Sequence, residues 1–311
     1  MEKKNRKKYK IDKMILRLIE MRFIKTSFII FFILSIITFG NKIGCQRTPV
    51  KKSRILYLPV DKSSLYTIDM DGSGSTELFR TDFKPQWPSW SNHGTEIIFN
   101  TYDKKYEGVY IFNILDNNLK KIKLTQLVDL PCWSGDGKNI AFMNEDTPGI
   151  IISSVKGDVL RTVAGEGING AYHNWSPTDN QLVFESGRDG NPEIYTINPL
   201  TGNELKRLTN NELLDEWPSF SKDGLLIAWV RGVEGNKDIW VMNRDGSGPK
   251  QISFDINIGD GFPSFSPDGS ELVFQSNSEK DSASINIINV DGSNLRKIGD
   301  GFFPNWSPYL E

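Results

Sequence analysis

Residues 263–269 read Pro-Ser-Phe-Ser-Pro-Asp-Gly, and the chain holds six related copies of this segment. Each copy centres on an aromatic residue followed by Ser, and the other five lie at residues 88–94, 131–137, 173–179, 218–224 and 304–308. The central aromatic residues are spaced by 43, 42, 45, 45 and 41 residues, and they are Trp90, Trp133, Trp175, Phe220, Phe265 and Trp306. A repeat of this length is typical of the blades of a β-propeller.

The same order of elements follows each aromatic-Ser turn. An apolar run such as residues 226–229 comes first, then a polar loop, a second apolar run such as 239–242, and another glycine turn such as 244–247. Asp-Gly between β-rich runs indicates a hairpin, because Gly adopts the positive φ of a tight turn without steric cost. Runs of three to five apolar residues fit strands that are buried on both faces. The pattern therefore predicts four strands in each repeat.

The strand types can be counted separately. Second-strand runs begin near residues 55, 96, 139, 181, 225 and 271, and third-strand runs near 65, 109, 150, 194, 239 and 285. First strands number six only if the C-terminal copy at Trp306 is included, because the run at Ile55 has no first strand before it. The sequence thus predicts an all-β, six-bladed propeller over residues 54–311. Its C-terminal strand pairs with the N-terminal blade, which removes exposed sheet edges.

Composition excludes several functional classes. The 311 residues have a net charge of −2, but residues 1–45 hold 11 of the 37 basic residues and 3 of the 39 acidic ones. The remaining part is therefore acidic, which argues against nucleic-acid binding, since phosphate contacts need clustered Lys and Arg. Two cysteines, Cys45 and Cys132, exclude a disulfide scaffold and a Cys-based zinc site. With only two histidines as well, we expect no metal, cofactor or catalytic group.

The N-terminus has the layout of an export signal. Residues 26–41 carry no charge and follow a strongly basic segment, which is typical of a signal peptide. The apolar run is slightly short for a membrane span, and an uncleaved anchor over 26–41 is the alternative. Ile43-Gly44-Cys45 is similar to the end of a bacterial lipoprotein signal, which implies lipidation of Cys45, although Lys42 departs from that motif. We therefore expect a signal at 1–45, a linker at 46–53 and export to the periplasm or cell surface.

One repeat carries a family resemblance. Residues 175–177 (Trp-Ser-Pro), 184–191 (Phe-Glu-Ser-Gly-Arg-Asp-Gly-Asn) and 194–195 (Ile-Tyr) resemble the propeller repeat of TolB-like proteins, and the match extends over about 255 residues. The resemblance implies a periplasmic protein that binds envelope proteins. It also implies an additional N-terminal domain, for which the few residues between Cys45 and Ile55 leave no room. The fold by itself leaves function open, because one scaffold hosts many activities.

An aromatic residue precedes the central aromatic by three positions in five of the six repeats. Leu130 stands there in the remaining repeat, and the five are Trp87, Tyr172, Trp217, Phe262 and Phe303. We expect them on the rim formed by the loops that lead into the first strands. A ring of this kind can hold a peptide or stack on a sugar. The alternative is that these side chains only pin neighbouring blades together.

Polar candidates lie on the same predicted rim. They are Asp129, His173, Arg188, Asp215 and Glu216. These groups can meet a basic peptide or a cation, or they can simply cap turns and face water. The sequence holds neither a Gly-x-Ser-x-Gly elbow nor a phosphate-binding Gly-Lys-Ser/Thr loop. It favours a membrane-tethered module that binds an envelope protein or peptide. The alternative is a saccharide-binding or saccharide-cleaving propeller in which Asp215 and Glu216 act as acid and base.

Overall fold

The computed structural model describes residues 53–124, 128–144, 148–164, 172–254, 259–279 and 282–309. These residues belong to one compact unit, Lys51–Glu311. The predicted signal at 1–45, including residues 26–41 and Cys45, and all of the linker except Ser53 lie outside the described residues. Within the described ranges, no helix is long and apolar enough to cross a membrane.

Six four-stranded antiparallel sheets form the blades, numbered here from the N-terminus. Blade 1 contains β24 (Phe302–Trp306), β1 (Ile55–Leu58), β2 (Ser64–Ile68) and β3 (Thr76–Arg80), and blade 2 contains β4 (Gln86–Trp90), β5 (Glu96–Thr101), β6 (Gly108–Asn113) and β7 (Asn118–Lys121). Blade 3 contains β8 (Val128–Trp133), β9 (Asn139–Asn144), β10 (Ile150–Ser154) and β11 (Val159–Val163), and blade 4 contains β12 (His173–Trp175), β13 (Leu182–Ser186), β14 (Glu193–Ile197) and β15 (Lys206–Arg207). Blade 5 contains β16 (Leu214–Phe220), β17 (Leu226–Val233), β18 (Asn236–Asn243) and β19 (Lys250–Gln251), and blade 6 contains β20 (Gly259–Phe265), β21 (Glu271–Glu279), β22 (Ser282–Asn289) and β23 (Arg296–Asp300).

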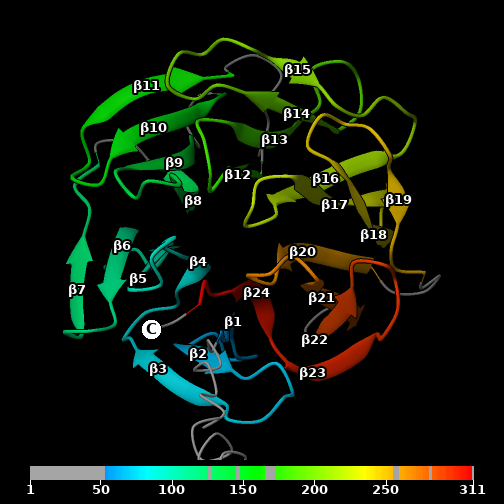
Figure 1. Cartoon of the computed structure of the whole chain (residues 1–311). Helices are drawn as coiled ribbons and strands as arrows, with labels where there is room; N and C mark the ends of the chain where they lie inside the picture. The colour runs from blue at the N-terminus through cyan, green and yellow to red at the C-terminus, as the bar shows by residue number, and fades with distance from the viewer. Residues whose placement is uncertain are drawn as a thin grey trace, which may run out of the picture. The chain divides into compact units, whose positions relative to one another are not determined.

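The blades are arranged in a ring around a central channel, as predicted (Figure 1). The first strand of each blade lies innermost and the fourth strand outermost. The ring closes between the two ends of the chain, where β24 pairs with β1 in the register Ile55↔Trp306 and Leu56↔Asn305. The Trp306 indole N–H also donates to Ser53 Oγ at 3.0 Å. The predicted closure by the C-terminal strand is confirmed.

Apolar side chains fill the space between neighbouring blades. Each of the six clusters found among the described residues joins two adjacent blades; between blades 4 and 5, for example, Val183 and Ile194 pack with Phe220 and Trp229. All five residues of β14 are buried, as a strand sandwiched between two other sheets must be. The short, uninterrupted apolar runs of the sequence have this cause, since neither face of such a strand meets water.

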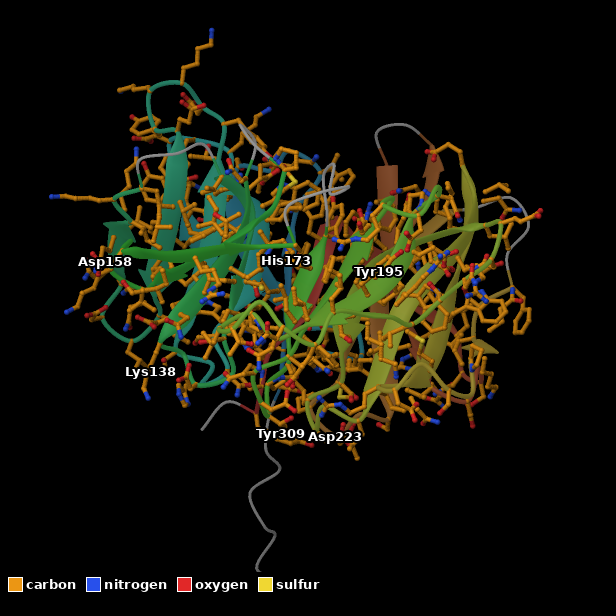
Figure 2. The ribbon with its side chains drawn as sticks, turned by 90° about the horizontal axis from the view of Figure 1, so that it is seen from above. Lys138, Asp158, His173, Tyr195, Asp223 and Tyr309 are labelled. Carbon is orange, nitrogen blue, oxygen red and sulfur yellow. The ribbon has the colours of Figure 1, made fainter. Side chains whose placement is uncertain are left out.

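The two rims of the propeller differ in their connections. The turn rim holds the turns between first and second strands and those between third and fourth strands; the loop rim holds the segments that lead into the first strands and the loops between second and third strands. Ser221 shows the turn chemistry, since its hydroxyl donates to Asp223 Oδ1 at 2.6 Å while Gly224 adopts a φ of +71°. In Figure 2, Asp223 and Tyr309 lie at the lower edge, Lys138 lies higher at the left, and His173 lies above all three.

Candidate functional site

The five aromatic residues predicted at the loop rim line the central channel, and we call them the aromatic ring. They are Trp87, Tyr172, Trp217, Phe262 and Phe303. Where φ is described, the residues at this repeat position have values of 52° to 54°, and they are Trp87, Leu130, Trp217, Phe262 and Phe303. Each stands at a register irregularity of its first strand. An inserted residue of this kind turns its side chain out of the sheet, here toward the channel.

Positive φ is unfavourable for bulky residues, so the surrounding structure must hold these backbones in place. Strain of this kind is concentrated at functional sites. No Gly or Asn stands at these positions, so the residue types alone do not indicate a positive φ.

Ring contacts run both around and across the channel. Trp217 stacks on Phe262 of the next blade with centroids 4.4 Å apart, and Trp87 lies 4.1 Å from Phe303. Trp87, Tyr172 and Phe262 come from alternate blades, yet their centroids are only 5.4 to 5.7 Å apart. The first set of contacts fits the alternative, in which the aromatics pin neighbouring blades. The second set, which the repeat alone did not indicate, narrows the channel at the loop rim.

A cavity of about 120 Å³ lies in the channel directly at the aromatic ring. It is lined by three residues from each blade: the ring position, the Pro or His173 that follows it, and the next residue. His173 is buried, with 8% of its surface exposed. The third lining position of each blade, two residues after the ring position, forms what we call the polar layer. It consists of Ser89, Cys132, Asn174, Ser219, Ser264 and Asn305.

The polar layer joins the blades by hydrogen bonds. Asn174 Oδ1 accepts the Phe220 N–H at 2.9 Å, and Ser264 Oγ accepts the Trp306 N–H at 3.1 Å. Each bond runs from one blade to the central aromatic of the next. Cys132 stands in the same layer and is buried, which raises the pKa of its thiol to about 12. Burial keeps this thiol in the unreactive protonated form.

Glu185 lies behind the aromatic ring and was not predicted. Its Oε2 accepts the N–H of Trp217 at 2.8 Å. Desolvation of the carboxyl group raises its pKa to about 8. Gln275 has the same place in blade 6, and its Oε1 accepts the N–H of Phe303 at 3.0 Å. The fold therefore uses an acceptor at this position to hold the bulged backbone, and an acid is not essential for that purpose.

Asp129 is also buried at the loop rim. It accepts the backbone N–H of Leu130 at 2.7 Å and a hydrogen bond from the Tyr102 hydroxyl. Burial raises the pKa of the Asp129 carboxyl, while these two hydrogen bonds oppose the rise. Tyr102 in turn lies 3.4 Å from the indole nitrogen of Trp87. Asp129 therefore supports a ring position and its neighbour rather than facing open solvent.

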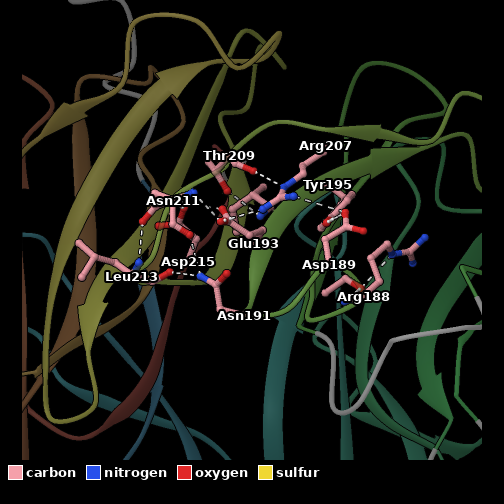
Figure 3. Close-up of polar contacts among 12 residues, drawn as sticks. Arg188, Asp189, Asn191, Glu193, Tyr195, Arg207, Thr209, Asn211, Leu213 and Asp215 are labelled. Atoms are coloured by element: carbon pink, nitrogen blue, oxygen red, sulfur yellow. Dashed lines mark hydrogen bonds and ion pairs between the residues drawn. The ribbon is translucent and has the colours of Figure 1, made fainter.

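Asp215 is fully buried and belongs to a polar network (Figure 3). It receives Arg231 Nε and Nη2 at 2.7 and 2.9 Å, and the indole N–H of Trp229 at 3.0 Å. Asn211 bonds both Asp215 and Glu193, so the network ties the segment leading into β16 to blade 4. This segment positions Trp217. With all of these donors, Asp215 serves as a structural anchor.

Glu216 is held by an ion pair. Lys237 Nζ lies 2.7 Å from Glu216 Oε2 and 5.2 Å from the centroid of the Trp217 ring. A cation over an aromatic face is attracted to its π electrons, so Lys237 also fixes the orientation of the indole. The carboxylates of Asp215 and Glu216, predicted as an acid-base pair for the saccharide alternative, are each occupied by a basic partner.

Arg188 and Asp189 lie on the loop between β13 and β14. The Arg188 guanidinium lies 5.1 Å from the Tyr195 ring and bonds Ser186, whereas Asp189 accepts the Tyr195 hydroxyl at 2.5 Å. Figure 3 shows Asp189 directed toward Arg207, with which it forms an ion pair at 3.5 Å. These contacts order the loop beside the channel.

The predicted site residues thus fall into two groups. The aromatic ring and His173 line one cavity, whereas Asp129, Arg188, Asp215 and Glu216 hold the structure around it. Within the ranges that the structure describes, no group of three His, Cys, Asp or Glu side chains is placed to hold a metal ion. Glu185 and Lys237 escaped prediction because neither residue type is repeated at its position; the position of Glu185 holds Asn100 in blade 2 and Gln275 in blade 6, a polar signal that could have indicated it.

Comparison with known proteins identifies relatives of this structure. The family model described as "TolB beta propeller domain" matches residues 43–310. An uncharacterized protein of Agrobacterium fabrum, Atu1656, is 32% identical over 151 residues, which cover 44% of this chain and 51% of that protein. The Tol-Pal system protein TolB of Francisella tularensis subsp. mediasiatica is 25% identical over 256 residues, covering 77% of this chain and 58% of the relative.

Among solved structures, TolB from Acinetobacter baumannii superposes with a TM-score of 0.68 at 21% identity. The match covers 83% of this chain and 67% of that one. This chain therefore spans between half and three fifths of the length of the two curated relatives.

Proposed function

Because the chain belongs to the TolB beta-propeller family, we propose that it is an exported module that binds a protein or peptide of the cell envelope at its loop rim. The relative from Francisella is a Tol-Pal system protein, which supports a partner of this kind. The uncharged segment 26–41 supports export, and lipidation of Cys45 would tether the propeller, at 54–311, to a membrane.

The observation that carries the proposal is the aromatic ring. Its five members are only partly buried, although Trp, Tyr and Phe gain much from full burial. Trp and Tyr are also the residues that most often dominate the binding energy of protein interfaces. The ring surrounds a cavity in a rim whose supporting groups are already paired. The contact surface is therefore preorganised, so binding a partner requires little further ordering.

The saccharide alternative receives less support. Acid-base hydrolysis or elimination needs carboxyl groups that are available to the substrate. Asp215 is fully buried against Arg231, and Glu216 is paired with Lys237. Glu185 has a raised pKa, but its Oε2 accepts the Trp217 N–H, and Gln275 Oε1 accepts the equivalent N–H in blade 6.

The test is recovery of a partner by the tagged full-length chain from crosslinked envelope fractions, comparing wild type with Trp217→Ala. Loss of one interfacial Trp costs about 2 kcal/mol or more, so we expect the affinity for the partner to fall at least about 30-fold and its recovery with the variant to drop clearly. Trp240→Ala is the matched control, because Trp240 is a partly exposed Trp of the same blade that lies outside the cavity lining.

Thermal unfolding must show that Trp217→Ala remains folded at the temperature of the experiment. Equal recovery of the same envelope proteins by wild type and Trp217→Ala would remove the aromatic ring as the contact surface. Recovery of glycans alone would favour the saccharide alternative.

A further inference from the structure

A second cavity, of about 50 Å³, lies on the turn-rim side of the polar layer. It shares all six polar-layer residues with the first cavity, so the two cavities are stacked along the channel. Its outer lining comes from the turns between first and second strands, namely Asn92, Gly135, Pro177 and Lys222. It is therefore separated from the aromatic ring by the polar layer.

Lys222 gives this cavity a positive charge. Other blades have Pro177, Pro267 and Pro308 at the same turn position, so the lysine is specific to blade 5. Its side chain is only partly exposed, and in the described parts of the chain no carboxylate and no hydrogen-bond acceptor pairs with it. Desolvation alone lowers the pKa of Lys222 to about 8, which leaves most of the ammonium group protonated at pH 7.

The polar layer adds neutral hydrogen-bond donors. Asn174 Oδ1 accepts the Phe220 N–H, and Asn305 Oδ1 accepts the Trp90 N–H at 3.2 Å. With the oxygen of each amide already bonded, the NH₂ group remains as the free end that lines the channel, and no acceptor among the described residues bonds it. Asp and Glu are absent from the described lining of this cavity. It thus combines one cation with several donors and no anion.

The mouth of the cavity restricts the size of a ligand. The Asn92 side-chain NH₂ donates to the Gly135 carbonyl at 3.0 Å, which joins the turns of blades 2 and 3. A Cβ atom on Gly135 would lie 2.4 Å from the Pro177 carbonyl oxygen, so the turns of blades 3 and 4 are also in close contact. Three of the six turns therefore crowd together there, and only a ligand of a few atoms fits a volume of about 50 Å³.

We propose that this cavity binds a small monovalent anion, of the size of a halide or formate, between the Lys222 ammonium group and the amide NH₂ groups of Asn174 and Asn305. A desolvated cation with neutral donors around it attracts an anion strongly, because charge-assisted hydrogen bonds gain strength where water is excluded. The bound anion connects blade 5 to blades 1 and 4 across the channel. The site lies beyond the polar layer from the aromatic ring and does not depend on the proposed function.

The proposal can be tested by titrating the full-length chain with sodium bromide or sodium formate. The background is sodium gluconate at constant ionic strength and pH 7, because gluconate is too large for the cavity. Isothermal titration calorimetry should detect a single site in the wild type. Lys222→Met should weaken binding at least about ten-fold, and bromide-soaked crystals should show an anomalous peak beside Lys222. Comparison of the bromide and formate affinities distinguishes a halide from a carboxylate ligand.

A second variant keeps the proposal testable if Lys222→Met does not fold. Asn174→Asp retains an oxygen for the Phe220 N–H but replaces the NH₂ donor with negative charge, so it should also weaken anion binding at least about ten-fold. Lys138→Met is the control, since Lys138 lies on the same rim and is 80% exposed. The proposal is overturned if the wild type binds neither anion, or if Lys222→Met and Lys138→Met bind equally well.

Discussion

At two positions of the aromatic ring, a side chain of the preceding blade holds the backbone in place. A bulky residue with φ near 53° costs about 1–2 kcal/mol relative to an ordinary strand conformation. The backbone N–H groups of Trp217 and Phe303 stand at the bulges. They donate to Glu185 and Gln275, respectively, of the preceding blade. These contacts let the propeller present large aromatic surfaces to the channel in a fixed orientation.

Glu185 makes stability depend on pH in a defined direction. Its pKa is about 8 in the folded chain and near 4.5 when the group is free, so between these values the folded state holds the additional proton. The free energy of unfolding should therefore fall as pH rises from about 5 to 8. Glu185→Gln keeps the acceptor and removes the titration. Its stability relative to wild type should increase across this range, as measured by urea unfolding at several pH values.

Gln275→Glu provides the reciprocal control. A carboxyl group placed in the equivalent position of blade 6 should introduce a pH dependence of the same sign. Parallel stability curves for wild type and Glu185→Gln would show that Glu185 does not change its protonation in this range.

The first strands of the blades hold the aromatic ring and the polar layer. The strand β16 shows how such a strand is fixed in place. Asp215 and Arg231 are direct cross-strand partners on β16 and β17, and the Asp215 side chain is fully buried. Through Asn211 the same carboxylate holds the segment that leads to Trp217. The strand is thereby fixed at its loop-rim end, while the polar layer fixes it further along.

Removing one partner of this ion pair should lower the free energy of unfolding more than removing both partners. Asp215→Ala leaves the Arg231 guanidinium, which is 15% exposed, without its carboxylate, and we expect a loss of about 3 kcal/mol in the free energy of unfolding. The double variant Asp215→Ala/Arg231→Met should be more stable than Asp215→Ala, because it removes both charges. Denaturant unfolding of a double-mutant cycle gives these values.

Asp179→Ala is the surface control for this prediction. Asp179 pairs with Arg244 at 2.8 Å, but both side chains are at least 31% exposed, so its loss should cost less than about 1 kcal/mol. Similar losses for Asp179→Ala and Asp215→Ala would contradict the structural role assigned to the buried pair.

At the scale of the whole molecule, the ring is maintained by pairing the two ends of the propeller. β24 supplies the innermost strand of blade 1, and Trp306 packs with Ile55 and Ile287 between blades 6 and 1. Without it, β1 would expose a row of unpaired backbone groups, which promotes aggregation. The cooperative unit therefore includes residues that are about 250 positions apart in the sequence.

Removal of residues 302–311 should abolish cooperative unfolding and shift the chain to aggregates in size-exclusion chromatography. The milder change Trp306→Ala should lower the free energy of unfolding by about 3–5 kcal/mol, since the indole is 1% exposed. Tyr309→Ala, at a side chain that is 38% exposed, is the control and should leave stability nearly unchanged. A monomeric, cooperatively folded truncation would show that closure is dispensable.

Repetition of the aromatic-Ser segment and its glycine turns was sufficient to predict the fold, the number of blades and the closing strand. Such features recur six times, so each copy supports the others. The aromatic ring was likewise predicted, because its members share one repeat position. The ion pair of Asp215 with Arg231 and the placement of Lys222 at the channel each belong to one blade, and the acceptor for the ring-position N–H is Glu185 in blade 4 but Gln275 in blade 6, so the repeat pattern did not indicate these contacts. They join residues from different strands and blades, so only the closed ring, which sets the distances between blades, determines which side chains meet.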